Sequence, residues 1–263
     1  MSPRPAVINV MVRAADRAAR ALKRDFGEVE NLQVSRKGPA DFVSAADLRS
    51  EEILRQELGK ARPGFALLME ESGKHEGRDE GAGCWIVDPL DGTTNFLHGL
   101  PHFAVSIALE ERGEITAGVV YDPIKEELFW AEKGGGAYLG DRRIRVSGRS
   151  RLEDCLLATG IPFRGHGDPE SFARELRGAM AQTAGVRRWG TASLDLAYVA
   201  AGRFDGFWEH GLSPWDIAAG WLLVREAGGF VTELDGRSLK LDSPSILAAN
   251  GELHPGLVKL LRA

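Results

Sequence analysis

The sequence predicts a mixed helix-and-strand fold of the α+β or α/β class, because strand pairs dominate its first half and strands alternate with helices in its second. Apolar segments at 103–109 and 116–121 are separated by a short polar turn, as expected of an antiparallel hairpin. Beyond Val146 a strand-like segment at 156–161 is followed by a helical pattern at 171–183. This change of pattern predicts two structural halves.

The length of the chain is compatible with two halves, and its periodicity predicts two helices in the first. A chain of 263 residues can form one large domain or two closely packed halves. We expect an N-terminal α+β half at 1–147 and a C-terminal α/β half at 148–263. Apolar residues at helical spacing predict an amphipathic helix at 6–26 and another at 44–58, whereas 31–43 is expected to be a loop or a mobile hairpin.

An acidic pair follows the strand predicted at 65–69. Glu70 and Glu71 come directly after its last apolar residue, and the polar, glycine-rich stretch 73–83 is expected to be a surface loop. Either acid taken alone could be a solvated surface charge. Their position at a strand end also suits a binding site.

The most informative stretch is Asp88–Pro101, which follows the short apolar strand Cys84–Val87. Pro89 is expected to end the strand, because proline cannot donate to the hydrogen-bond ladder. Gly92 permits a tight turn, and Thr93 is a favourable residue for the start of a helix. A strand, two carboxylates and a helix start therefore follow one another within ten residues.

These residues suit a cation beside an anion. Asp88 and Asp91 offer the oxygen ligands of a divalent cation, and the N–H groups of Gly92 and Thr93 can face a phosphate. An Asp-Pro or Asp-Gly pair alone is usually only a turn. Both pairs in one frame, between an apolar strand and a helix start, favour a metal site next to a phosphate site.

The stretch Asp88–Pro101 closely resembles the signature of the inositol monophosphatase family, within the larger group that includes the fructose bisphosphatases. Glu70-Glu71 matches the acidic pair of that family. Asp41–Asp47 is similar to a further motif, with Ser44 where the family usually has threonine, and Trp215–Gly220 resembles its second signature. The resemblance implies a layered αβαβα sandwich of the sugar-phosphatase type.

The resemblance also implies two Mg²⁺ ions, or three, as cofactors. Glu70, Asp88 and the backbone carbonyl of Leu90 would hold the first ion, and Asp88, Asp91 and Asp216 the second. A ligand set of oxygens without His or Cys favours Mg²⁺ over zinc. For Asp216, a favourable interaction with a helix dipole is an alternative reason for its position.

Catalytic and substrate-binding roles follow from the same resemblance. Thr93, with Asp47 and Glu70, would orient the attacking water and draw off its proton. The residues implied in substrate binding are Gly92, Thr93, Ala192, Glu209 and Asp216. Glu209 would accept hydrogen bonds from inositol hydroxyls, but it could also meet the ammonium group of histidinol phosphate or be an exposed strand end.

The expected activity is hydrolysis of inositol 1-phosphate to inositol and phosphate by two-metal activation of water. Histidinol phosphatase or another sugar-phosphate phosphatase on the same fold remains an alternative. Arg187 and Arg188 keep a bisphosphate substrate open, although such a pair is more often solvated surface. A non-catalytic regulatory protein that binds metal or phosphate is a further alternative. Relatives are often lithium-sensitive and commonly homodimers, so both properties are expected here.

Composition limits the partners and the location. A net charge of −5 argues against nucleic acid as the main partner, because phosphate backbones require a basic face. Cys84 and Cys155 are expected to be buried, reduced thiols. Charged residues at 13–17 interrupt the apolar core that a signal peptide needs, and no apolar run reaches the roughly 18 residues of a membrane span. No membrane association and a cytoplasmic location are expected.

Overall fold

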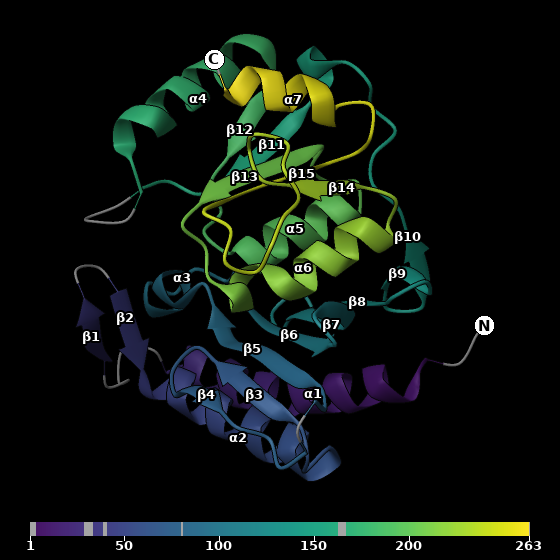
Figure 1. Cartoon of the computed structure of the whole chain (residues 1–263). Helices are drawn as coiled ribbons and strands as arrows, with labels where there is room; N and C mark the ends of the chain where they lie inside the picture. Colours follow the sequence, from purple (N-terminus) through teal and green to yellow (C-terminus); the bar gives the residue numbers. More distant parts are fainter. Residues whose placement is uncertain (1–3, 29–33, 39–40, 80, 163–166, 263) are drawn as a thin grey trace.

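The computed structural model describes residues 4–28, 34–38, 41–79, 81–162 and 167–262. Five layers alternate in it: a helix pair, a large sheet, a second helix pair, a smaller sheet and a third helix pair (Figure 1). The αβαβα sandwich that the family resemblance implies is therefore confirmed.

The larger sheet has eight strands in the order β10-β9-β8-β7-β6-β5-β3-β4. Its strands are β3 (Ala66–Met69), β4 (Gly73–His75), β5 (Cys84–Asp91), β6 (Ala104–Glu111), β7 (Glu114–Asp122), β8 (Glu127–Glu132), β9 (Gly136–Leu139) and β10 (Arg142–Ile144). All neighbouring strands are antiparallel except β3 and β5, which run parallel. The two strands that carry predicted site acids thus point their carboxyl ends the same way.

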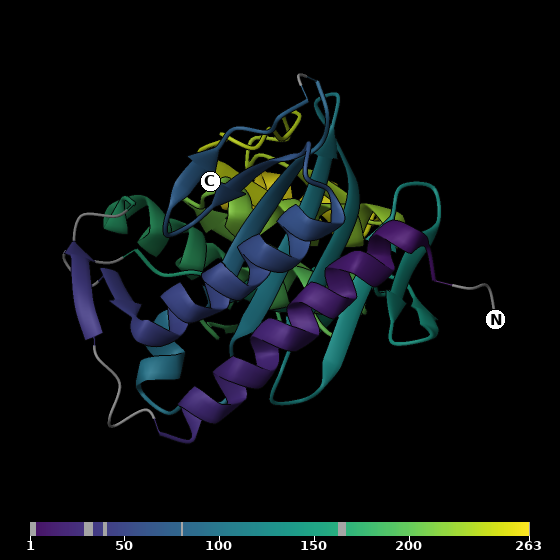
Figure 2. The same cartoon turned by 90° about the horizontal axis from the view of Figure 1, so that it is seen from below.

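Helices α1 (Ala6–Phe26) and α2 (Ala45–Ala61) cover one face of this sheet (Figure 2). Helix α1 buries a stripe of small and apolar residues that includes Ile8, Met11 and Leu22, as its periodicity predicts. These side chains pack into one cluster with Trp85 and Val87 of β5. The core between this helix pair and the sheet therefore supports one face of β5.

The smaller sheet has five strands in the order β12-β11-β13-β15-β14. They are β11 (Leu156–Thr159), β12 (Gly185–Arg187), β13 (Gly206–His210), β14 (Phe230–Thr232) and β15 (Ser245–Ala249). Strands β12, β11 and β13 are parallel, and β13, β15 and β14 are antiparallel. Its outer face packs against α4 (Pro169–Gln182) and α7 (His254–Leu261), so the second half is mixed α/β as expected.

Helices α5 (Ala192–Ala200) and α6 (Pro214–Glu226) lie between the two sheets and share one buried cluster with both (Figure 1). Every residue of α5 is buried. An ideal Cβ at Gly220 would lie 2.5 Å from Cβ of Leu196, so the glycine of the second signature lets the two helices approach closely.

The first sheet ends at Ile144 and the second begins at Leu156. The proposed division at residue 147 falls between them. Because α5 and α6 bury apolar surface against both sheets, the division into two halves remains a proposal about organisation.

Strand structure occurs in three segments where the sequence predicts a loop, a loop or hairpin, or a strand end. The stretch 73–83 was expected to be only a loop, but it begins with strand β4, which pairs with β3. The stretch 31–43 contains the hairpin of β1 (Val34–Gly38) and β2 (Asp41–Ser44), while 31–33 and 39–40 lie outside the described residues. Pro89 does not end β5, which continues to Asp91.

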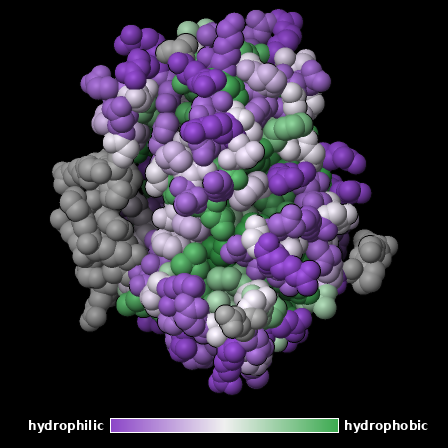
Figure 3. Space-filling model, viewed as in Figure 1, coloured by the Kyte–Doolittle hydropathy of each residue, from purple (hydrophilic) through white to green (hydrophobic). Residues whose placement is uncertain are grey.

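The surface and the thiols agree in part with the predictions. The face seen in Figure 3 is largely hydrophilic, with hydrophobic residues showing mainly between polar ones near its middle. No helix in the described ranges is long and apolar enough to cross a membrane. Both cysteines are free, but only Cys155 is buried, whereas Cys84 is half-buried.

Candidate active site

The predicted acids of the first half emerge at the same end of two neighbouring strands. Met69 of β3 pairs in parallel with Val87 of β5, so the next residues, Glu70 just beyond β3 and Asp88 within β5, lie side by side. The backbone N–H of Glu70 donates to the carbonyl of Val87 over 3.3 Å. A hydrogen bond also joins the side chains of Glu70 and Asp88. The two acids that the resemblance assigns to one ion are thus in contact.

Asp216 reaches this place from the second half. It occupies the first turn of α6, where Oδ2 accepts a hydrogen bond of 2.7 Å from the N–H of Ser213. Burial raises the pKa of Asp88 well above its usual value, and the charges of Glu70, Asp91 and Asp216 raise it further. Burial and the charge of Asp91 likewise raise the pKa of Asp216. The four acids therefore form one electrostatic cluster.

Asp91 is held by the start of α5. The backbone N–H of Ser193 donates to its Oδ2 over 2.8 Å, and the N–H of Ala192 also points to this carboxylate. Burial raises the pKa of Asp91 to about 6, while these hydrogen bonds oppose the rise. Of the predicted substrate residues, Ala192 is thus placed directly beside a predicted metal ligand.

A β-bulge bends β5 between Asp88 and Asp91. Asp88 pairs with Ser106 and Asp91 with Ala104, so two residues of β5 stand opposite a single residue of β6. Pro89 sits in this bulge, where it owes no ladder hydrogen bond. Its carbonyl accepts from Oγ of Ser50 over 2.7 Å. The proline therefore reorients the strand instead of ending it, which corrects the sequence prediction.

The bulge also fixes the carbonyl of Leu90. The N–H of Leu90 donates to Oδ1 of Asp88 over 2.9 Å, and its carbonyl lies 3.0 Å from Oγ1 of Thr93. The apolar side chain of Leu90 is fully buried, so only its backbone carbonyl could coordinate a metal ion. This arrangement suits the role of a carbonyl ligand that the resemblance gives to Leu90.

A buried chain of hydrogen bonds links Thr93 to Asp47. Oγ1 of Thr93 donates to Oδ1 of Asp47 over 2.9 Å. Oδ2 of Asp47 accepts from the N–H of Ser44 over 2.8 Å and from the Ser44 hydroxyl. Burial raises the pKa of Asp47, although these hydrogen bonds oppose the rise. Ser44 and Asp47 also form the capping box of α2, so the predicted proton acceptor Asp47 is part of the helix cap.

Gly92 joins β5 to the short helix α3 (Thr93–Leu97) in a left-handed conformation, with φ of 92°. An ideal Cβ there would lie 2.6 Å from Oγ1 of Thr191 and 3.2 Å from the carbonyl of His102. Both the backbone angle and the lack of space require glycine. Asn95 of α3 donates to the carbonyl of Trp189 over 2.8 Å, which fastens α3 to the segment that precedes α5.

Glu209, which the resemblance assigns to the substrate hydroxyls, is half-buried on β13. Burial raises its pKa to about 8, the charge of Asp91 contributes to the rise, and the charge of Arg188 opposes it. It is therefore not simply an exposed strand end, which was the alternative. The guanidinium of Arg187 donates to the neighbouring carbonyl of Val186 over 3.1 Å, away from the acids.

Sequence reasoning missed Asp195. This residue of α5 is 1% exposed, and its buried Oδ1 has no hydrogen-bond partner in the described part of the chain. Burial raises its pKa well above the usual value, and the charges of Glu209 and Asp91 raise it further. An acid between Leu194 and Leu196, in a helix that is otherwise almost wholly apolar, is the signal that could have identified it.

The donor set fits a hard divalent cation. A nearby cation would favour the ionised form of carboxylates that raise one another's pKa, and carboxylate oxygens are ligands that Mg²⁺ prefers. In the described ranges no three such side chains are already gathered in the arrangement of a metal site.

A histidine site is not supported. His98 is exposed, whereas His102 packs edge-to-face on Trp189 with ring centroids 4.9 Å apart. Nδ1 of His102 lies 3.2 Å from Nζ of Lys125, and burial lowers the pKa of His102 to about 4. The two histidines therefore do not form the zinc pair that their spacing might suggest.

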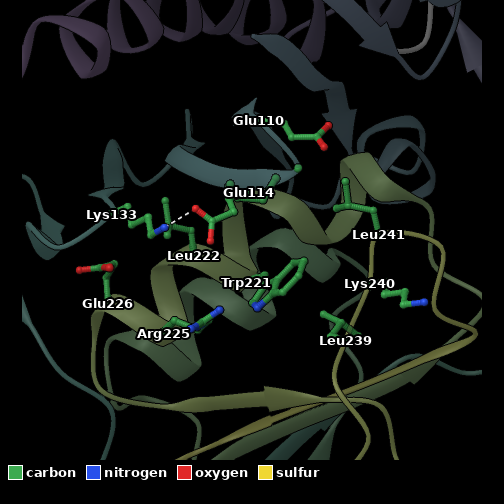
Figure 4. A pocket seen from close by; sticks show the side chains of 12 residues that line it. Glu110, Glu114, Lys133, Trp221, Leu222, Arg225, Glu226, Leu239, Lys240 and Leu241 are labelled. Atoms are coloured by element: carbon green, nitrogen blue, oxygen red, sulfur yellow. Dashed lines mark hydrogen bonds and ion pairs between the residues drawn. The ribbon is translucent and has the colours of Figure 1, made fainter. Parts of the chain in front are cut away.

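A separate cleft of 580 Å³ lies along the far half of α6 (Figure 4). Trp221 and Arg225 point into it, and Lys133 pairs with Glu114 at its edge. It contains none of the predicted site residues. The acidic cluster at the opposite, N-terminal end of α6 is therefore the candidate site.

Five alternating layers, with acids gathered where β3 and β5 meet the starts of α5 and α6, define a layered sugar-phosphatase-type α/β protein. Comparison with known families agrees with this class. The chain belongs to the inositol monophosphatase family, whose model matches residues 5–263.

Individual relatives are similar over nearly their whole length. An inositol-1-monophosphatase of Mesorhizobium japonicum is 59% identical over 98% of this chain and 97% of its own. A Pseudomonas aeruginosa protein called Nus factor SuhB is 46% identical over 97% and 96%. The crystal structure of extragenic suppressor protein suhB from Bartonella henselae has a TM-score of 0.94 at 58% identity, covering 98% of this chain and 99% of that one.

Proposed function

We propose that this chain is a Mg²⁺-dependent phosphomonoesterase that hydrolyses inositol monophosphate to inositol and phosphate. The observation that carries the proposal is the mutual electrostatic coupling of Glu70, Asp88, Asp91 and Asp216 at one place. Membership of the inositol monophosphatase family and the name of the Mesorhizobium relative support the substrate class.

The proposed ligand sets are those that the family resemblance implies. Glu70, Asp88 and the carbonyl of Leu90 would hold one Mg²⁺, and Asp88, Asp91 and Asp216 would hold a second. The proposal allows a third ion. When bound, the ions would neutralise the acids and supply positive charge that favours both the attacking hydroxide and the leaving alkoxide. Ser193 N–H orients Asp91 for this task, and the bulge orients the carbonyl of Leu90.

The protein's own groups would handle the proton and the phosphate. Thr93 would bind the attacking water and, with Asp47 and Glu70, take up its proton. Burial raises the pKa of Asp47, which makes its carboxylate a better proton acceptor than an exposed aspartate. The N–H groups of Gly92 and Thr93, at the start of α3, would receive a phosphoryl oxygen.

The alcohol part of the ester would lie toward Ala192 and Glu209. A carboxyl group at Glu209 can accept hydrogen bonds from neighbouring hydroxyls. Arg188 is electrostatically engaged with Glu209 and Asp195, so it is poorly placed to bind a second phosphate. This favours a monophosphate over a bisphosphate. Glu209 would also suit the ammonium group of histidinol phosphate, which is the competing substrate.

One panel of esters tests the substrate. Phosphate release from inositol 1-phosphate, histidinol phosphate, fructose 1,6-bisphosphate and adenosine 3′,5′-bisphosphate is compared by kcat/KM in Mg²⁺. We expect inositol 1-phosphate to have the highest value. A higher value for histidinol phosphate would move the assignment to that ester without changing the metal chemistry.

A regulatory role is the second candidate, because the Pseudomonas relative is called a Nus factor. The net charge of −5 does not favour direct binding to nucleic acid. Turnover of 4-nitrophenyl phosphate in Mg²⁺ separates an enzyme from a binding protein. Its complete absence in folded protein would favour the regulatory role.

Three further properties remain proposals: inhibition by lithium, a homodimeric state and a cytoplasmic location. Exposed Leu100 and Trp189, which flank the α3 region, offer apolar surface for a second copy. Light scattering coupled to size exclusion measures the mass directly. A dose response to LiCl at fixed Mg²⁺ tests the inhibition.

A further inference from the structure

Glu209 and Gly160 are neighbours across two parallel strands. Thr159 of β11 pairs with Trp208 of β13, so the next residues are Gly160, directly after β11, and Glu209 of β13. An ideal Cβ at residue 160 would lie 2.5 Å from Oε2 of Glu209, and closer still to its Cδ and Oε1. The carboxyl group of Glu209 therefore occupies the space that a side chain at residue 160 would need.

Space, and not backbone conformation, explains this glycine. Gly160 is absent from the described glycines with positive φ, so an L-residue could adopt its backbone angles. Residue 160 is buried, and Oγ1 of Thr159 donates to its carbonyl over 3.0 Å. A side chain there is excluded chiefly by the Glu209 carboxyl.

Charge opposes a move of the Glu209 carboxyl toward Asp195. Asp195 is buried, its Oδ1 has no partner among the described residues, and its charge and that of Glu209 oppose each other. Bringing the two carboxyl groups closer would bury like charges. Arg188 attracts Glu209. A carboxyl displaced from Gly160 would therefore leave the position it now holds without approaching Asp195.

We propose that Gly160 is a specificity-determining residue: its missing side chain sets the position of the Glu209 carboxyl, and this selects phosphate esters whose alcohol carries neighbouring hydroxyls. The inference rests on the proposed function, because it takes Glu209 as the acceptor for those hydroxyls. An ester without hydroxyls would not sense the position of Glu209.

The substitution Gly160→Ala tests this, because the added methyl group conflicts mainly with the end of a flexible side chain. We expect the ratio of kcat/KM for inositol 1-phosphate to that for 4-nitrophenyl phosphate to fall about ten- to a hundredfold, the value of one or two charge-assisted hydrogen bonds. Gly148→Ala is the matched control, since no atom of the described residues lies within 4 Å of an ideal Cβ at that exposed residue. An unchanged ratio in Gly160→Ala overturns the inference.

A double-mutant cycle separates positioning from damage to the fold. In a Glu209→Ala background no carboxyl remains to be displaced, so Gly160→Ala should change the ratio by less than about twofold. If Gly160→Ala lowers the ratio equally in both backgrounds, Gly160 does not act through Glu209.

Failure of the proposed function would look different. A wild-type chain that cleaves the aryl ester but not inositol 1-phosphate contradicts the proposed substrate. A crystal structure of Gly160→Ala then decides the positioning by itself. A displaced Glu209 carboxyl supports it, and an unmoved carboxyl with a shifted backbone overturns it.

Discussion

The N–H of Ser193 donates a hydrogen bond of 2.8 Å to Oδ2 of Asp91, across 102 positions of the sequence. This bond joins the end of β5 to the start of α5, which lies between the two sheets. One proposed metal ligand is therefore oriented by the opposite half of the chain, so the site depends on the packing of both sheets.

Asp91→Asn should retain the fold and lose turnover. An amide oxygen can still accept from Ser193 N–H, but it brings no negative charge to a cation. We expect kcat/KM for inositol 1-phosphate to fall by at least about a hundredfold, measured at saturating Mg²⁺ with circular dichroism as the control for folding. Wild-type activity in this variant would remove Asp91 from the metal site.

Ser44→Ala should affect both stability and catalysis, because Ser44 caps α2 and also bonds to Asp47. Loss of the cap should cost about 1 kcal/mol in the free energy of unfolding, and kcat should fall as well. Asp168→Ala, which removes the N-cap of α4, is the matched control. It should lose similar stability with kcat unchanged; equal kcat values in the two variants would separate Ser44 from catalysis.

The stability of the metal-free protein should fall as pH rises. Folding raises the pKa of Asp91 from 3.8 to about 6 and that of Glu209 from 4.5 to about 8. A carboxyl with a raised folded-state pKa contributes stability in full below its unfolded pKa, and loses it as pH passes through the folded value. In EDTA we expect Tm to fall between pH 5 and about pH 8, and excess Mg²⁺ to reverse the loss by mass action. A Tm at pH 8 that is indifferent to Mg²⁺ would contradict this.

Asp195→Asn should stabilise the metal-free protein more at alkaline than at acidic pH. The amide keeps the shape of the side chain while removing a charge that opposes Glu209 and Asp91. We expect a gain of about 1 kcal/mol or more in the free energy of unfolding at pH 8 and a smaller gain at pH 5, measured by urea titration in EDTA. The same change at both pH values would show that charge is not the cause.

Much of the fold could be predicted from local patterns in the sequence. The apolar stripe of α1, the strand Ala66–Met69 with its following acids and the capped start of α6 are all local features. Pro89 was misjudged because a bulge depends on the partner strand, and the register between Asp88 and Asp91 is visible only in the pairing with β6.

The rest of the site depends on contacts that no local pattern encodes. Asp195 has no motif around it, and its importance follows from burial near Glu209 and Asp91. Gly160 resembles any glycine at a strand end until the Glu209 carboxyl is seen across it. Both properties result from packing between elements that lie far apart in the chain.

The most direct test measures phosphate release from inositol 1-phosphate as Mg²⁺ is added to EDTA-treated protein, for the wild type and for Asp88→Asn. Asp88 is the acid that the charges of Glu70, Asp91 and Asp216 all influence. The account predicts no turnover in EDTA, full recovery of the wild type with Mg²⁺ and no recovery of Asp88→Asn at any Mg²⁺ concentration. Turnover in EDTA, or wild-type activity of Asp88→Asn, would contradict it.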